Sequence, residues 1–453
     1  MKKLKLYSTN LQADTVSFSE ALLKGIALDR GLYMPEEVPT FTMEEIDAFS
    51  DMEYFEIAYE VIKKFLVGEI EDTVLYELVK DAYNYDVPLE KVVDSKYILR
   101  LDQGPTASFK DFAARMMGRL MNYYLSKENK SLLILTATSG DTGSAIANAY
   151  YGLHNIKVVV LYPETEVTNR QRKQMTTLGE NVQIIAVDGK FDDCQAMVKE
   201  AFADRDLDHL NLSSANSINI GRLIPQTVYY FWAFAKLRKG TADDDIIFSV
   251  PSGNFGDMMG GVLAMKMGLP VKKFVIATNN NDVFPVFMKT GIYSKIEPSR
   301  NCISSAMNVG HPSNMSRLMA LYGGVMNEKG EILTLPDMDE MNKEIHAVSI
   351  SEEETRSTIK ETWRNHNVLL EPHGSVGWAG MLDYLKENPE ADDQLCVSLE
   401  TAHPAKFPEE IIKILNIDPE LPKSLEGLED KVEHYDFLKN EYTDFKNYLL
   451  KKY

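Results

Sequence analysis

The sequence predicts an α/β protein with parallel β-sheets and more than one domain. Short apolar runs rich in β-branched residues recur from about Tyr97 onward, and stretches long enough for a helix separate them. This alternation is typical of βαβ units, in which a helix connects two parallel strands. A length of 453 residues also exceeds what one ordinary hydrophobic core accommodates. The clearest predicted strands are Leu132–Thr136, Val158–Tyr162, Val182–Val187, Ile246–Val250, Phe274–Thr278 and Leu395–Leu399.

The two ends of the chain differ from this pattern. Residues 1–95 are acidic, and we predict that they are mostly helical. Residues 421–453 are predicted to form a charged helical C-terminal extension, because apolar residues recur there at helical spacing. These apolar residues are Leu428, Val432, Tyr435, Tyr442, Phe445 and Leu449.

The composition argues against several classes of function. A net charge of −20 predicts that the chain binds no nucleic acid, because nothing offsets the repulsion of phosphates over a broad surface. The three cysteines form no CxxC pair and the histidines no HExxH motif, so we expect neither a metal site nor a disulfide framework. No apolar run reaches the roughly 18 residues that a membrane helix needs, and no secretory signal is recognisable. We expect a cytoplasmic protein that binds no membrane.

Two loops of similar composition follow predicted strands. ATSGDTG at 137–143 and PSGNFGD at 251–257 each lie between a strand and a predicted helix. In open α/β sheets, ligands bind beyond the carboxyl ends of the strands. Free N–H groups and the positive end of the helix dipole make such a loop an anion site, and Gly253 and Gly256 allow the N–H groups to turn inward. An ordinary capped turn is the alternative for each loop.

Lys110 is the candidate reactive lysine. It lies in GPTASFKD at 104–111, between apolar residues and at the start of a predicted helix. Desolvation and the positive end of the helix dipole both lower the pKa of a lysine, which suits an amine that forms an imine. The alternative is a surface lysine with a solvated ammonium group.

Two further segments carry polar side chains. NSINIGR at 216–222 combines Asn216, Ser217 and Arg222, which could clamp a phosphate, because arginine binds phosphate through two parallel hydrogen bonds. A capped helix followed by a surface arginine is the alternative. ETAHP at 400–404 follows a predicted strand, and we expect His403 to be structural.

Taken together, these segments resemble the threonine synthase family of fold-type II enzymes that depend on pyridoxal 5'-phosphate (PLP). The shared segments are YSTN…VSFSEALLKGIALDRGLYMPE, GPTASFKDF, TATSGDTGSA, SANSINIGRL, VPSGNFGD, ATNNND, EPHGSVG and TAHPAKF, which occur in this order over most of the chain. The resemblance implies a tryptophan synthase β-like fold, with PLP between two parallel-sheet α/β domains. Residues 96–130 and 215–420 would form the large domain, and residues 131–214 the small mobile one.

The resemblance also implies roles for individual residues. Lys110 corresponds to the Schiff-base lysine, Asp141 faces the ring hydroxyl of the cofactor, and Thr401 lies near the pyridine nitrogen. The loop for the cofactor phosphate comprises Gly253, Asn254, Phe255, Gly256 and Asp257. Thr138, Ser139 and Thr142 would bind the substrate, the last two through its carboxylate. Asn216, Ser217 and Arg222 would bind the substrate phosphate.

The implied reaction is the last step of threonine biosynthesis. O-phospho-L-homoserine and water give L-threonine and phosphate, by γ-elimination followed by β-addition of water. One alternative is a phospho-lyase that eliminates phosphate and releases a 2-oxo acid and ammonia. Another is a non-catalytic module that binds PLP or an acidic metabolite, but the presence of both anion loops, the lysine and the clamp argues against it. The family includes monomers and homodimers.

Overall fold

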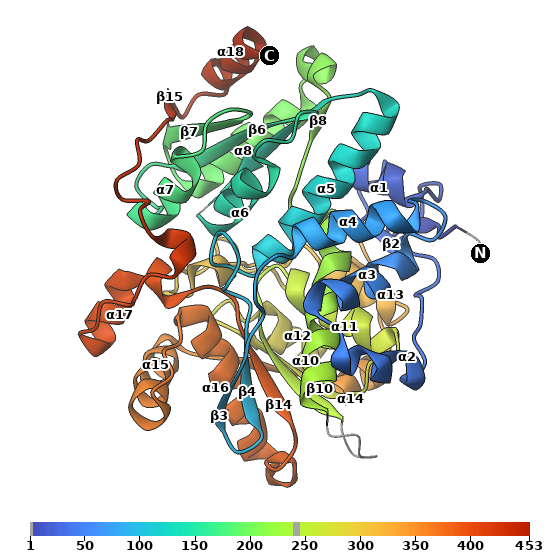
Figure 1. Cartoon of the computed structure of the whole chain (residues 1–453), viewed down its shortest axis with the longest axis vertical. Coiled ribbons are helices and arrows are strands. Elements are labelled where there is room, and N and C mark those ends of the chain that lie inside the picture. Colours follow the sequence, from blue (N-terminus) through green and yellow to red (C-terminus); the bar gives the residue numbers. More distant parts are fainter. Residues whose placement is uncertain (1–2, 139, 239–244) are drawn as a thin grey trace.

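The computed structural model describes residues 3–138, 140–238 and 245–453. Two sheets lie at opposite ends of the molecule (Figure 1), a six-stranded one with the order β13-β10-β9-β14-β4-β3 and a five-stranded one with the order β15-β7-β6-β5-β8. All neighbouring strands in both sheets are parallel, except β3 and β4, which are antiparallel. The predicted α/β class with parallel sheets is confirmed.

The six-stranded sheet is covered by helices on both faces. Its strands are β3 (Leu89–Val93), β4 (Lys96–Arg100), β9 (Ile246–Pro251), β10 (Val271–Thr278), β13 (Ile345–Ser349) and β14 (Cys396–Glu400). The helix α16 (Pro372–Glu387) packs on one face, where Trp378 joins Ile247 in a buried cluster. On the other face, Tyr230 of α10 (Val228–Leu237) packs edge-on against Phe248, with 4.9 Å between ring centroids.

The five-stranded sheet is also buried on both faces. Its strands are β5 (Leu132–Ala137), β6 (Ile156–Pro163), β7 (Val182–Asp188), β8 (Leu212–Ser213) and β15 (Asp436–Lys439). Along β5, Leu133 and Leu135 face a cluster formed with α8 (Phe191–Ala203), while Ile134 belongs to the main core on the opposite face. Burial on both faces explains the continuous apolar runs, and all six predicted strands are confirmed with small changes at their ends.

Helices are the main regular structure of the N-terminal region, but they cover less than half of it, and the region also contains the strands β1, β2 and β3. Its helices are α1 (Phe18–Lys24), α2 (Met43–Asp47), α3 (Tyr54–Phe65) and α4 (Asp72–Ala82). The strands β1 (Leu6–Ser8) and β2 (Tyr33–Pro35) pair antiparallel. Tyr54, Tyr83 and Phe112 form an aromatic cluster that holds this region against α5 (Lys110–Glu128). The helix α5 also contacts α6 (Asp141–Tyr150), and it runs from the centre of the molecule toward the five-stranded sheet (Figure 1).

The remaining elements are mostly short. The other α-helices are α7 (Asn169–Thr176), α9 (Ile220–Leu223), α11 (Gly256–Lys266), α12 (Val283–Thr290), α13 (Met315–Leu321), α14 (Met338–Glu344), α15 (Glu352–His366), α17 (Pro408–Leu415) and α18 (Tyr442–Lys452). The 3₁₀ turns are η1 (Ala48–Asp51), η2 (Arg205–Leu210), η3 (Ile224–Thr227), η4 (Ser305–Met307), η5 (Pro389–Ala391), η6 (Pro404–Lys406) and η7 (Lys423–Leu425). The strands β11 (Val325–Met326) and β12 (Ile332–Thr334) form a separate hairpin.

The C-terminal extension is not helical throughout, and this corrects the prediction. Residues 436–439 form the edge strand β15, which pairs parallel with β7, and only Tyr442–Lys452 is α-helical. Phe445 and Leu449 of that helix are buried, whereas Val432 and Tyr435 are 72% and 43% exposed. Pairing with the open edge of the five-stranded sheet satisfies backbone groups of residues 436–439, so the tail completes that sheet.

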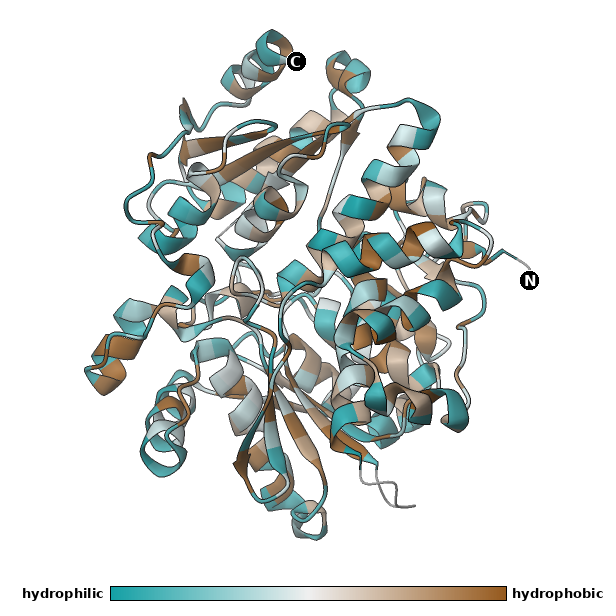
Figure 2. Cartoon of the chain, viewed as in Figure 1, coloured by the Kyte–Doolittle hydropathy of each residue, from teal (hydrophilic) through white to brown (hydrophobic). Residues whose placement is uncertain are grey.

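Apolar residues concentrate in the strands of both sheets, while most peripheral helices carry both hydrophilic and hydrophobic residues (Figure 2). Among the described residues, no helix is both long and apolar enough to cross a membrane.

Candidate active site

Lys110 is held beside the end of β14 by backbone pairing between two loops. The N–H of Phe109 donates to the carbonyl of Thr401 (2.9 Å), and the N–H of His403 donates to the carbonyl of Ala107 (3.0 Å). Asp111 closes the loop from within, since its carboxylate accepts hydrogen bonds from the N–H (2.8 Å) and hydroxyl (2.6 Å) of Thr106. The structure therefore brings Lys110 and Thr401 together, as predicted.

The environment of Lys110 favours an uncharged amine. Its Nζ lies 4.8 Å from the centroid of the Phe109 ring and 3.7 Å from Oδ2 of Asp141. Burial lowers the pKa of Lys110; Asp141 opposes this shift, while the positive charges of Lys406 and Arg222 reinforce it. A lysine whose pKa lies below its usual range is available as a nucleophile and as a base.

Asp141 is ionised and held by a second lysine. Nζ of Lys406 lies 2.6 Å from Oδ1 of Asp141, and Nε2 of Gln171 donates to the same oxygen (2.9 Å). Burial by itself would raise the pKa of Asp141, but the charge of Lys406, and that of Lys110 when it is protonated, outweigh burial and keep this pKa well below its usual range. We did not predict Lys406 as a site residue, although it lies in the segment TAHPAKF.

The loop before α6 differs partly from its predicted role. The hydroxyl of Thr138 accepts hydrogen bonds from the N–H groups of Gly140 (2.9 Å) and Gly143 (2.8 Å), so it stabilises the loop itself. Thr142 is half-buried in the first turn of α6. Ser139 lies outside the described residues. Binding of the substrate by Thr138, Ser139 and Thr142 stays a prediction.

The PSGNFGD loop joins β9 to α11 and forms the start of that helix. Phe255 is buried with φ of +63°, and this turn directs the chain into α11. Gly253 approaches η4 so closely that a Cβ atom there would lie 2.9 Å from the carbonyl oxygen of Ala306. Asn254 is exposed, and its side-chain oxygen accepts hydrogen bonds from the N–H (3.3 Å) and hydroxyl (3.2 Å) of Ser313. The N-terminus of α11 thus offers backbone N–H groups to an anion.

We expect Asp257 in this loop to make the free energy of unfolding depend on pH. Burial raises the pKa of Asp257 from 3.8 to about 6, although the N–H of Met258 donates to its Oδ1 (2.9 Å) and opposes the shift. The folded chain binds this proton more tightly than the unfolded chain, so the free energy of unfolding falls as pH rises from about 4 to about 6. Asp257→Asn should stabilise the cofactor-free chain by about 3 kcal/mol at pH 8 and by little at pH 4. Urea unfolding at both pH values measures this, and an equal difference at both would contradict it.

The segment of the predicted phosphate clamp lies next to this loop, and binding of a phosphate by Asn216, Ser217 and Arg222 stays a prediction. Arg222 is buried, and its Nη1 donates to the carbonyl of Ala215 (2.8 Å), while its Nε has no hydrogen-bond partner among the described residues. Burial lowers the pKa of Arg222 to about 10, so it stays charged at neutral pH. The hydroxyl of Ser217 lies 3.2 Å from that of Ser313, and Oδ1 of Asn216 accepts from the hydroxyl of Thr136 (3.3 Å) at the end of β5.

Arg317, which we did not predict, connects three parts of the site. It is fully buried, and its guanidinium donates to the carbonyls of Tyr33 (3.1 Å) and Ile218 (2.7 Å) and to Oδ1 of Asn314 (2.7 Å). Asn314 in turn donates to the carbonyl of Asn254 (2.9 Å). Arg317 therefore fixes the N-terminal region, the clamp segment and the PSGNFGD loop relative to one another.

A buried cluster of Glu371, His373 and Glu400 supports the PSGNFGD loop through η4. Nε2 of His373 accepts from the N–H of Ala306 (3.0 Å) in η4, so the ring proton lies on Nδ1, which donates to Glu371 (2.5 Å). Burial and the charge of Glu371 raise the pKa of Glu400 well above its usual range. The cluster anchors η4, against which Gly253 packs.

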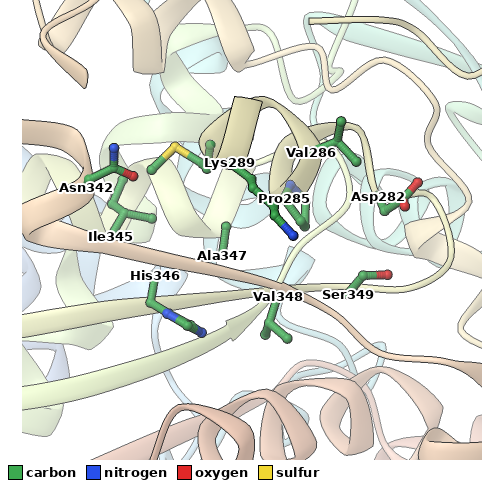
Figure 3. Close-up of a pocket in the computed structure, with 11 residues that line it drawn as sticks. Asp282, Pro285, Val286, Lys289, Asn342, Ile345, His346, Ala347, Val348 and Ser349 are labelled. Atoms are coloured by element: carbon green, nitrogen blue, oxygen red, sulfur yellow. The ribbon is translucent and has the colours of Figure 1, made fainter. Parts of the chain in front are cut away.

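A separate surface pocket of about 440 Å³ lies between α12 and β13 (Figure 3). Its lining includes Lys289, His346 and Ser349 and none of the predicted site residues. This pocket is therefore distinct from the site around Lys110.

The residues around Lys110 fit PLP. The cofactor needs an amine that can lose its proton, an anion site for its phosphate and polar groups for its ring. Lys110 supplies the first, the start of α11 the second, and Asp141 and Thr401 lie close to Lys110. Fold and site together define the class of protein as a PLP-dependent enzyme. In agreement, the family model described as pyridoxal-phosphate dependent enzyme matches residues 88–400.

Two further family models and several relatives identify the family within this class of enzymes. The models for the threonine synthase N terminus and C-terminal region match residues 5–83 and 375–449. The threonine synthases of Escherichia coli (strain K12) and Serratia marcescens are 39% and 38% identical to the chain over 423 residues, covering 93% of it and 94% and 93% of their own lengths. The chain therefore belongs to the threonine synthase family.

Solved structures agree over almost the whole chain. The PLP-bound threonine synthase from Brucella melitensis has a TM-score of 0.92 at 35% identity, covering 99% of each chain. The yeast threonine synthase has a TM-score of 0.91 at 30% identity, covering 99% of this chain and 98% of its own. The predicted fold-type II class and the PLP cofactor are confirmed.

Proposed function

We infer that the chain converts O-phospho-L-homoserine and water to L-threonine and phosphate, and we propose that Lys110 is the residue that bears the cofactor. Family membership supports the reaction. One observation supports the role of Lys110: it is a lysine of lowered pKa, 3.7 Å from an ionised aspartate, at the start of a helix beside the end of β14. The other residue roles extend this assignment.

The cofactor, when bound, withdraws electrons from the substrate, and the protein positions and protonates the reacting groups. Gly253 to Asp257 would hold its phosphate, and Asp141 would face its ring hydroxyl. Thr401 would lie near the pyridine nitrogen and leave it unprotonated, because a hydroxyl is neutral. Two features of the loops support these roles. The helix α11 begins at Gly256, and Oδ2 of Asp141 lies 3.7 Å from Nζ of Lys110.

Lys110 would also move the protons of the reaction. Its uncharged amine would take a proton from Cα and then one from Cβ, after which phosphate leaves from Cγ. Return of a proton to Cγ, addition of the hydroxyl of water at Cβ and return of a proton to Cα would then give threonine. Thr142 and Ser139 would hold the carboxylate, and Asn216, Ser217 and Arg222 the phosphate.

Arg222→Lys tests the phosphate clamp. Lysine keeps the charge but lacks the planar fork of donors that matches a phosphate. We expect the KM for O-phospho-L-homoserine to rise about tenfold or more, equivalent to at least about 1.4 kcal/mol of binding, with unchanged affinity for PLP. Steady-state kinetics and a PLP titration measure the two quantities. Arg172→Lys, at an ion pair with Glu433, is the matched control. An unchanged KM in Arg222→Lys would show that Arg222 does not bind the substrate phosphate.

Product analysis tests the reaction. Purified protein with PLP and O-phospho-L-homoserine should release threonine and phosphate in equal amounts. Phosphate with 2-oxobutanoate and no threonine would identify a phospho-lyase. A PLP absorbance band without either product would identify a binding module.

The domain organisation belongs to the same proposal. Residues 131–214 would form a small mobile domain over the large one of residues 96–130 and 215–420. Contacts of α7 with the active-site loops support this arrangement, since Gln174 donates to the carbonyl of Thr106 (3.0 Å) and Gln171 to Asp141. A cytoplasmic location and a monomeric or homodimeric state stay predictions, and the three free, buried cysteines suit a reducing compartment.

A further inference from the structure

Two buried lysines share one carboxylate in the active site. Nζ of Lys406 lies 2.6 Å from Oδ1 of Asp141, and Nζ of Lys110 lies 3.7 Å from Oδ2. The side chain of Lys406 is 0% exposed, that of Asp141 4% and that of Lys110 12%. Two ammonium groups facing a single carboxylate would leave one positive charge uncompensated in a buried site, which is costly.

The geometry decides which lysine carries the proton. Lys406 has two acceptors, Asp141 and the carbonyl of Thr106 (2.9 Å), and its contact with Asp141 has the length of a strong charge-assisted hydrogen bond. The distance of 3.7 Å from Lys110 to Asp141 is too long for a hydrogen bond. The positive charge therefore belongs on Lys406.

The backbone around Lys406 holds it in place. The N–H of Lys406 donates to the carbonyl of His403 (2.9 Å), and the N–H of Ala405 donates to the His403 ring (3.2 Å). Burial lowers the pKa of His403 to about 4, so this ring is neutral and can accept. The carbonyl of Ala405 accepts from Arg170 (2.6 Å), which ties this turn to α7.

We propose that Lys406 is a positioning residue whose ammonium group holds Asp141 as a carboxylate and leaves Lys110 as an uncharged amine. The inference rests on the proposed role of Lys110 as the residue that bears the cofactor. Other charged groups act on the same trio. Arg222 favours the uncharged form of Lys110 and Asp257 the charged form, Gln171 donates to Asp141, and Asp111 and His403 face Lys406.

The test measures the ionisation of Lys110 directly. The full chain without PLP is labelled with trace acetic anhydride across a pH series, and peptide mass spectrometry quantifies acetylation of Lys110. In Lys406→Met, Asp141 interacts with Lys110 alone, so the pH midpoint for labelling of Lys110 should rise by about one unit and its labelling below that midpoint should fall about tenfold. Lys406→Arg keeps the charge and should retain the wild-type midpoint. An unchanged midpoint in Lys406→Met would overturn the proposal.

Two further variants separate charge from structure. Lys406→Gln keeps a hydrogen-bond donor without charge, and its midpoint should shift as in Lys406→Met; a wild-type midpoint would overturn the proposal. Adding Asp141→Asn to Lys406→Met should lower the midpoint again, because it removes the group that holds the proton on Lys110.

A measurement on the PLP-loaded chain complements the labelling. The pH midpoint of its visible absorbance should also rise in Lys406→Met, and a fixed midpoint would count against the proposal. Neither readout requires turnover. If the wild-type chain formed no threonine while the midpoints still shifted in Lys406→Met, the proposed function would be refuted and the role of Lys406 would stand.

Discussion

Lys110→Ala is expected to abolish turnover, with a fall of about 10⁴-fold or more in kcat. The substitution removes both the nucleophile that binds the cofactor and the base that moves the protons. The variant should also lack the visible absorbance of lysine-bound PLP. Phosphate release from O-phospho-L-homoserine and an absorbance spectrum measure the two effects. Turnover at the wild-type rate would refute the assignment of Lys110.

We expect Lys110→Ala to fold normally, so the loss of turnover would come from the missing amine and not from unfolding. Asp141 keeps its hydrogen bonds from Lys406 and Gln171 in the variant, so no buried carboxylate is left without a partner. Thermal unfolding of the cofactor-free proteins should therefore show a change of at most a few degrees. Lys130→Ala is the matched control, because the side chain of Lys130 is 65% exposed and lies far from the site in the loop before β5. It should retain wild-type activity and absorbance.

Much of the fold and part of the site could be predicted from the sequence, because their signals are local. Each buried parallel strand is a continuous apolar run, and each anion loop follows such a run directly. Lys110, Asp141 and the PSGNFGD loop are therefore recognisable from neighbouring residues in the sequence. Lys110 and the PSGNFGD loop follow β4 and β9 of the six-stranded sheet, so they meet at its carboxyl edge. Asp141 follows β5 of the five-stranded sheet, and its contact with Lys110 joins the two sheets at the site.

Lys406 and Arg317 could not be found in this way. Both act through partners that are distant in sequence: Lys406 contacts Asp141 and Thr106, and Arg317 contacts Tyr33 and Ile218. A single lysine or arginine in a sequence looks like a solvated surface residue, which is the usual state of both. Only the folded chain shows that these two are buried.

The C-terminal tail differs from its sequence pattern for a related reason. Apolar residues at helical spacing indicated one helix, but residues 436–439 lie opposite the open edge of β7. Strand pairing there depends on a neighbour that is distant in sequence, so local periodicity does not reveal it. The same periodicity was right for Tyr442–Lys452, where a helix buries Phe445 and Leu449.

Arg317→Met is expected to destabilise the chain by about 3–5 kcal/mol. Methionine fills similar space but donates no hydrogen bond. The carbonyls of Tyr33 and Ile218 and Oδ1 of Asn314 would lose their donor inside the core, at about 1–3 kcal/mol for each group left unpaired. Burial lowers the pKa of Arg317 to about 9, so at neutral pH the lost donor is a charged one.

The same substitution should also weaken the binding of phosphate groups, although Arg317 is not proposed to contact them. Arg317 fixes Asn314 and the clamp segment, and Asn314 fixes Asn254, so their loss loosens both anion sites. We expect a lower urea midpoint, and a higher KM for O-phospho-L-homoserine at temperatures where the variant stays folded. Arg356→Met, at a partly exposed ion pair with Glu352 within α15, should change the free energy of unfolding by at most about 1 kcal/mol. If both variants were equally stable, Arg317 would not connect the three segments energetically, and the order of the anion sites would have to come from the segments themselves.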